Sequence, residues 1–229
     1  MTTHEVVLPL FSGGASVDGK PTKRYRTLVA DPPWRYTARQ EDPTHQGRTQ
    51  YPTMTQAELL CLPIGLWAEP DAAHLYLWTT NNFLVDAFQL VKAWGFEYKT
   101  MLTWIKRHAP EEEDEETGEP GPRDDHWIGM GNYYRGVTEH VLFAIRGRLP
   151  VREHGKPNIF YAPHRGHSEK PDAFYSLMAS MSPGPYADVF ARKQRWVGEV
   201  NLEVMDTFGD QCFNFGTSLP PEHFTGAGK

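Results

Sequence analysis

Short apolar runs recur along the chain, separated by segments rich in charged residues, Gly and Pro. Strands of a sheet that is covered on both faces have this nearly continuous apolar character. The runs that we expect to form strands are residues 27–30, 73–78, 96–105, 137–145 and 186–191.

Helices are predicted between several of these strands. Thr55 and Glu58 match the capping-box pattern at the start of a short helix that ends near Pro63. A second helix begins at about residue 82 and ends at Gly95, and its core face would carry Leu84, Phe88 and Val91.

A third helix begins at Pro171, a residue suited to the first helical position. Its apolar positions follow helical spacing, so we expect them to face the core and not a cofactor. They are Phe174, Leu177, Met178 and Met181. Strands that alternate with helices across short turns predict an α/β fold.

The most distinctive polar segment is Asp31-Pro32-Pro33-Trp34, directly after the first apolar run. The two prolines end the strand, so a carboxylate, a backbone without donors and a large aromatic ring meet at its carboxyl end. Ligands bind at that edge in open α/β sheets. Taken alone, the tetrapeptide also fits a Pro-Pro turn with a surface Asp and a packing Trp.

Such a loop suits methylation of the exocyclic amine of a nucleobase. The lone pair of that amine is delocalised into the ring, and it becomes available when a carboxylate and a carbonyl each accept one N–H. Asp31 and the carbonyl of Pro32 or Pro33 could supply these acceptors. Trp34 or Tyr36 could hold a base that has left its stack.

Other site chemistries find little support in the sequence. There is no Gly-x-Gly-x-x-Gly fingerprint, no Walker loop and no nucleophile elbow. His164 and His167 are close in sequence, but no cysteine or second histidine pair completes a metal site. We therefore expect no metal and place His167 in a loop near the substrate.

Several further segments accompany the Asp31 loop in a fixed order: residues 51–54, 74–81, 131–135, 139–140, 167–171 and 188–192. Together they resemble the phage and bacterial type of the MT-A70 family, adenine N6-methyltransferases that use S-adenosylmethionine. The resemblance covers roughly residues 26–201. It implies a Rossmann-like class I methyltransferase sheet with permuted, beta-class motif order, in which the catalytic loop precedes the cofactor strand.

The resemblance also implies roles for individual residues. Asp31, Pro32, Pro33 and Trp34 would form the catalytic loop. Asp31 and Lys170 would bind the methionyl end of S-adenosylmethionine, and Arg192 would approach its ribose. The family usually continues through a Gly-Trp pair to Gly-Asn-Glu, which residues 193–201 do not repeat, so Asn201 is the position that could reach the ribose. The adenine side would be lined by Tyr36, Tyr51, Asn132, Glu139 and His167.

The implied activity is methyl transfer to the N6 amine of adenine in DNA. Three alternatives stay open: RNA as substrate, a catalytically silent family member that binds nucleic acid, and methylation of another amine such as cytosine N4. Silent members typically lose the acid or the prolines of the catalytic loop, and both are present here. Enzymes acting on cytosine more often carry Ser or Asn in place of the acid.

The net charge of −6 is unevenly distributed over the 229 residues. Residues 111–125 hold nine acidic residues and one basic residue, which leaves 20 acidic and 22 basic residues elsewhere, a net charge of +2. Basic residues gather at residues 20–26, 146–165 and 192–195, which permits a nucleic-acid partner without requiring one. The acidic segment is most simply a disordered insertion.

The length fits one main domain. We expect an irregular arm over residues 1–25, a methyltransferase domain over residues 26–205 with an acidic insertion at 109–128, and a tail over residues 206–229. Residues 1–11 lack a secretory pattern, and no apolar run is long enough to span a bilayer. The two cysteines, Cys61 and Cys212, suit a reducing compartment, so a cytoplasmic protein without a membrane partner is expected.

Overall fold

The structure, a computed structural model, describes residues 23–35, 53–108, 126–129, 133–165, 169–191, 196–197, 203–209 and 212–214. Its strands are β1 (Thr27–Ala30), β2 (Ala72–Thr79), β3 (Glu97–Arg107), β4 (Thr138–Gly147), β5 (Ile159–Pro163), β6 (Tyr186–Val189), β7 (Trp196–Val197), β8 (Glu203–Val204), β9 (Asp206–Gly209) and β10 (Cys212–Asn214).

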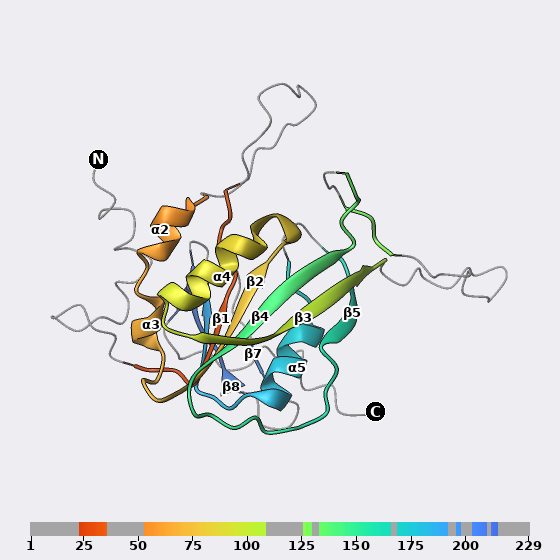
Figure 1. The fold of residues 1–229 in the computed structure, drawn as a ribbon. Coiled ribbons are helices and arrows are strands. Elements are labelled where there is room, and N and C mark those ends of the chain that lie inside the picture. The colour runs from red at the N-terminus through yellow and green to blue at the C-terminus, as the bar shows by residue number, and fades with distance from the viewer. Residues whose placement is uncertain are drawn as a thin grey trace, which may run out of the picture.

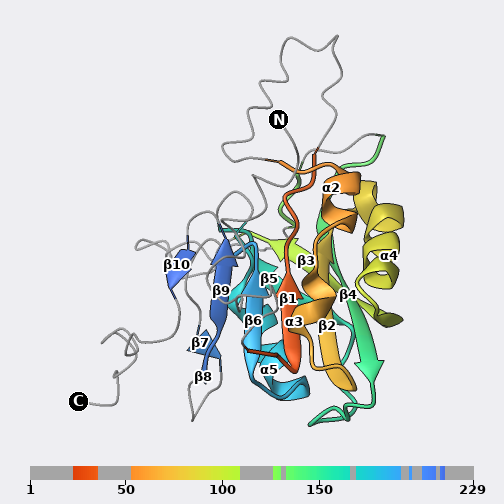
Figure 2. The ribbon, with the colours of Figure 1, turned by 90° about the vertical axis from the view of Figure 1, so that its left-hand side faces the viewer.

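Eight of the strands in the described residues form one sheet in the order β10-β9-β6-β1-β2-β4-β3-β5 (Figures 1 and 2). β1 lies between β2 and β6 and runs parallel to both, whereas β4 is antiparallel to β2 and β3. This mostly parallel α/β sheet confirms the expected Rossmann-like fold. β6 comes late in the chain yet pairs with β1, which agrees with the expected permuted order.

Helices cover both faces of the sheet. They are α2 (Gln56–Leu60), α3 (Ile64–Trp67), the 3₁₀ helix η2 (Asn81–Phe83), α4 (Leu84–Ala93) and α5 (Asp172–Met181). Side chains from α2, α3 and α4 share one core cluster with Leu28, Leu75 and Leu77. α5 packs in a second cluster with Val29, Tyr76 and Trp78. Because neighbouring strand residues point to opposite faces, these two clusters lie on opposite sides of the sheet.

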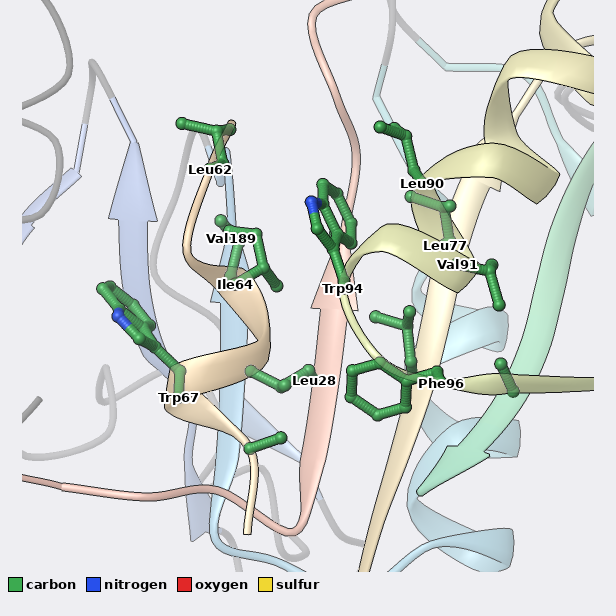
Figure 3. Packing of buried hydrophobic residues seen from close by; sticks show 14 of the residues in the cluster. Leu28, Leu62, Ile64, Trp67, Leu77, Leu90, Val91, Trp94, Phe96 and Val189 are labelled. Atoms are coloured by element: carbon green, nitrogen blue, oxygen red, sulfur yellow. The ribbon is translucent and has the colours of Figure 1, made fainter. Parts of the chain in front are cut away.

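Trp94 joins the helices of the first core layer (Figure 3). Its ring packs among residues that include Ile64 and Leu90, and its indole N–H donates to the carbonyl of Leu59 at 3.1 Å. This bond ties the end of α4 to α2. The apolar packing and the satisfied donor together fix the helical layer against the centre of the sheet.

Several predicted boundaries are confirmed. The capping box is present at α2, where the Thr55 hydroxyl accepts from Glu58 N at 3.3 Å and Thr55 N donates to the Glu58 carboxylate at 2.6 Å. α4 ends just before Gly95, whose positive φ of 79° is a conformation that favours glycine. α5 begins at Asp172, so Pro171 is its N-cap and not its first helical residue as expected.

The expected core face of α4 is wrong in part. Phe88 is 41% exposed and packs edge-on against Tyr98, while Ala87, Leu90 and Val91 are buried. Apolar residues occur on more than one side of this helix, so spacing alone could not select the face that meets the sheet. On α5 the buried residues are Phe174, Tyr175, Met178 and Ala179, and the expected Leu177 and Met181 are only partly buried.

Short elements escaped prediction. α3 and β5 have no periodic pattern long enough to recognise. β9 and β10 lie in the segment expected to be a tail, and β9 pairs in parallel with β6. Phe208 of β9 packs against Tyr25 and Trp67, so this part of the chain joins the core through distant contacts. None of the helices in the described part of the chain is both long and apolar enough to cross a membrane.

Candidate active site

The carboxyl ends of β1 and β6 meet at the centre of the sheet. Asp31, the first residue after β1, donates its backbone N–H to the carbonyl of Val189 at 3.2 Å. Phe190, the first residue after β6, has a positive φ of 69°, which is uncommon outside glycine. The chain leaves β1 toward β2 on one side, while β6 lies on the other, so this is a topological switch point of the kind at which open α/β sheets bind ligands.

The loop after β1 is held by its own backbone. Trp34 N donates to the Pro32 carbonyl at 2.8 Å, and Met54 N donates to the Pro33 carbonyl at 2.9 Å. A carbonyl oxygen has two lone pairs, so either proline carbonyl can still accept one amine hydrogen. The prolines themselves bring no competing N–H.

Trp34, which is expected to hold a displaced base, is largely covered in this structure. It is 7% exposed, belongs to the core, and stacks on Phe83 with ring centroids 5.1 Å apart and planes 9° apart. A stacking platform needs an accessible face. The Trp34 ring thus contacts η2 in this structure, and its role in holding a displaced base stays a prediction.

Asp31 belongs to a chain of four alternating charges. Its Oδ2 lies 3.0 Å from Lys170 Nζ, which lies 3.1 Å from Glu139 Oε2. The other oxygen of Glu139, Oε1, lies 2.7 Å from Lys106 Nζ. The side chains of Lys106, Glu139 and Lys170 are largely buried, whereas Asp31 is 23% exposed. The chain of charges thus runs through the interior and reaches solvent at the acid of the proline loop.

Three elements, β3, β4 and the start of α5, bring the other charges to Asp31 at the end of β1. Glu139 on β4 lies opposite Trp104 of β3 in the strand register, and Lys106 is two residues beyond Trp104 on the same face. Lys170 directly precedes the N-cap of α5. Aromatic rings flank both cations: Lys106 lies 5.2 Å from the Trp104 ring and 5.1 Å from the Trp127 ring, and Lys170 lies 5.0 Å from the Trp78 ring.

The charges stabilise one another. Burial alone would raise the pKa of the Glu139 carboxyl, but the Lys170 and Lys106 ammonium groups outweigh burial and lower this pKa to about 2. Burial alone would lower the pKa of Lys170, but Asp31 and Glu139 outweigh it and raise this pKa. Glu139 and Lys170 are therefore ionised throughout the neutral range.

Two histidines lie beside this cluster. His140 follows Glu139 on β4, and its Nε2 lies 2.7 Å from Asn81 Oδ1. Burial lowers the pKa of His140, and the Glu139 carboxylate opposes that shift. His164, considered above as a metal ligand, stacks on Trp127 with centroids 3.7 Å apart. Both rings border the site in hydrogen-bonded or stacked positions.

The structure brings together three of the residues that sequence analysis selected, Asp31, Glu139 and Lys170. Pro32 and Pro33 lie next to them in the loop. The remaining expected residues lie outside the described residues: Tyr36, Tyr51, Asn132, His167, Arg192 and Asn201. Lys106 was not predicted, although a lysine two residues beyond Trp104 and four beyond Leu102 lies on the same buried strand face and was a usable signal.

A Rossmann-like sheet with an acidic proline loop at its switch point is the arrangement expected of a methyltransferase of the MT-A70 type. The chain belongs to the MT-A70 family, whose family model matches residues 25–198. It is 30% identical over 210 residues to the Type II methyltransferase M.MunI from Mycoplasma sp, covering 81% of this chain and 80% of that protein.

Eukaryotic relatives match over a smaller part of their length. The chain is 28% identical over 162 residues to the N(6)-adenosine-methyltransferase MT-A70-like protein of Drosophila melanogaster, and 27% identical over 162 residues to the human N(6)-adenosine-methyltransferase catalytic subunit METTL3. Each match covers 70% of this chain, but only 23% of the fly protein and 24% of the human protein. The chain thus spans about a quarter of these relatives.

Proposed function

We propose that this protein uses S-adenosylmethionine to methylate the exocyclic N6 amine of adenine in DNA. The observation that carries the proposal is the position of Asp31 at the carboxyl end of β1, ion-paired to Lys170 and followed by two proline carbonyls. An acid and a carbonyl at one loop are the acceptors that a conjugated amine requires.

Each acceptor has a defined task in the proposed reaction. The Asp31 carboxylate accepts one N6 hydrogen, and the carbonyl of Pro32 or Pro33 accepts the other, which frees the nitrogen lone pair for the new N–C bond. S-adenosylmethionine, when bound, supplies an electrophilic methyl carbon whose former bonding pair stays on sulfur. The surplus proton leaves N6 for Asp31 or for water.

The residues at the switch point fit this cofactor. Its methionyl end carries an ammonium and a carboxylate, and Asp31 and Lys170 offer the complementary charges 3.0 Å apart. The chain turns at Phe190, directly after β6. Arg192 and Asn201, farther along the same segment, are the proposed ribose contacts.

The adenine side of the site is proposed from the family pattern. Glu139 lies within the charge chain, and its roles toward the base and toward Lys170 are compatible because a carboxylate offers several lone pairs. The other proposed base contacts are Tyr36, Tyr51, Asn132 and His167. We propose one methyltransferase domain that begins near residue 26 and, because β9 and β10 extend the sheet, continues to at least Asn214.

DNA is the favoured substrate because the similarity to a bacterial type II methyltransferase runs over most of both chains. RNA is the second candidate, supported by the N(6)-adenosine-methyltransferases among the relatives. Base removal from a duplex costs a few kcal/mol, so unpaired adenine should react more readily in either polymer. A catalytically silent member is disfavoured by the presence of Asp31 and both prolines.

The test is direct. Purified protein is incubated with methyl-labelled S-adenosylmethionine and matched DNA and RNA oligonucleotides, which are then digested to nucleosides. The proposal predicts labelled N6-methyldeoxyadenosine. Label only in N6-methyladenosine would move the assignment to RNA, label in cytosine would refute the adenine assignment, and no label in any polymer would support a silent member.

A further inference from the structure

Lys106 is a buried lysine that the proposed chemistry does not use. It is 9% exposed, and its ammonium is the inner end of the chain Lys106–Glu139–Lys170–Asp31. We infer that Lys106 is a positioning residue: by holding one oxygen of Glu139, it leaves the other oxygen to direct Lys170 toward Asp31. The activity measurements that test this inference rest on the proposed function, whereas the titration of Glu139 tests the geometry alone.

The two oxygens of Glu139 have separate partners. Oε1 lies 2.7 Å from Lys106 Nζ, and Oε2 lies 3.1 Å from Lys170 Nζ. The Lys170 ammonium also contacts a second carboxylate, because its Nζ lies 3.0 Å from Asp31 Oδ2. Without Lys106, both Glu139 oxygens would compete for the Lys170 ammonium, because a lysine can donate three hydrogen bonds and a carboxylate can accept at both oxygens. Lys170 would then turn from Asp31 toward Glu139.

Charge balance also shows that Lys106 matters to the state of Glu139. Two carboxylates face two ammonium groups, so the chain is neutral, and removing Lys106 leaves an uncompensated negative charge in a largely buried site. Protonation of Glu139 relieves that charge. In a variant without the Lys106 charge, Glu139 therefore takes up a proton at higher pH than in the wild type.

Other ionisable groups near Glu139 are few among the described residues. Lys106 faces it from β3 and Lys170 from the segment before α5, with Asp31 beyond Lys170. On β4 itself, His140 is the next residue and bonds to Asn81. His164 stacks on Trp127 near the Lys106 ammonium. Burial lowers the pKa of His140, which lies next to Glu139, so the test must separate the histidines from Glu139.

A direct contact with nucleic-acid phosphate does not fit Lys106. Its side chain is 11% exposed, and the Trp104 and Trp127 rings flank the ammonium. Its backbone is fixed at both ends: Lys106 N donates to Val137 O at 2.9 Å, and Trp127 N donates to Lys106 O at 3.1 Å. A lysine whose ammonium is buried and already paired is poorly placed to meet the phosphate backbone of a nucleic acid at the surface.

The test compares Lys106→Met, which keeps the apolar stem, with Lys106→Arg, which keeps the charge. In methyl transfer to a DNA oligonucleotide, we expect Lys106→Met to lower kcat about tenfold or more with little change in KM, and Lys106→Arg to restore most of the rate. The acid limb of the pH profile should move to higher pH in Lys106→Met. Lys99→Met is the matched control, since Lys99 pairs with exposed Glu97 on the same strand.

A double-mutant cycle separates Glu139 from the histidines. In a Glu139→Gln background there is no carboxylate for Lys106 to compensate, so Lys106→Met should cost little more. Fully additive losses, or a raised KM at unchanged kcat, would overturn the inference and indicate direct substrate contact.

A measurement without activity keeps the two proposals distinguishable. Carbon-13 NMR of the Glu139 carboxyl should show a higher titration midpoint in Lys106→Met than in the wild type. If Lys106→Met fails to fold, Lys106→Gln, which keeps a donor but no charge, takes its place in the same titration. An unchanged midpoint refutes the role of Lys106 even if no nucleic acid is methylated, whereas a raised midpoint without methylation refutes only the proposed function.

Discussion

Replacing Glu139 by Gln should destabilise the protein by an amount that depends on pH. The two lysines lower the Glu139 pKa from its ordinary 4.5 to about 2. At about 1.4 kcal/mol per pH unit of difference, ionised Glu139 stabilises the folded state by about 3 kcal/mol at neutral pH. Because the pKa is lower in the folded state, this stabilisation is complete above about pH 4.5 and is lost as the pH falls toward about 2.

The assay is urea unfolding of wild type and Glu139→Gln at about pH 7 and about pH 3. The pH-dependent part of the difference in unfolding free energy between wild type and variant should be about 3 kcal/mol at about pH 7 and about half of that at about pH 3. Loss of the carboxylate that pairs with Lys106 and Lys170 adds a further cost that is common to both pH values. Only the decrease between the two pH values is diagnostic.

Glu97→Gln is the control, because Glu97 pairs with Lys99 on the exposed part of β3. Exposed pairs contribute about 0–1 kcal/mol, so this variant should match the wild type at both pH values. A Glu139→Gln difference that stays constant or increases on acidification would refute the charge-chain account of Glu139.

Three further predictions concern other parts of the chain. Trp34→Ala removes a buried ring stacked on Phe83 and should cost about 3–5 kcal/mol in chemical denaturation, with activity on paired and unpaired adenine falling alike; a loss confined to paired DNA would support a base-holding role. Lys170→Ala and Arg192→Ala should weaken S-adenosylmethionine binding in calorimetry more than oligonucleotide binding, and unchanged cofactor affinity would remove both from the site. Replacing residues 111–125 by a short Gly-Ser linker should preserve melting temperature and turnover, and a large drop in either would show a positive role for the acidic segment.

Local sequence signals predicted much of the fold and, within the charge chain, Asp31. Asp31 and the two prolines identify the strand end on their own, and Thr55 with Glu58 fixes the start of α2. Glu139 and Lys170 came from the order of the family's motifs. Their pairing with each other and with Asp31 depends on two strands, β1 and β4, and the start of α5, which meet only in the folded chain.

The missed features depend on contacts between distant segments. Trp34 resembles an exposed stacking residue in sequence, and only the position of Phe83 on η2 shows that its ring is covered. Phe88 has helical spacing but packs on Tyr98 outside the core. Lys106 interrupts an apolar strand face, and its significance becomes visible only when β4 places Glu139 beside it.

The most direct test of the central claim is methyl transfer by Asp31→Asn. Asn is nearly isosteric but cannot supply a charged acceptor, and loss of such a group typically lowers the rate by about 10²–10⁴-fold. Wild type and variant are compared for N6-methyldeoxyadenosine formed in the same oligonucleotide, after circular dichroism has shown that both are folded. The account predicts product from the wild type and at least about a hundredfold less from Asp31→Asn. Near-normal turnover by the folded variant would contradict it.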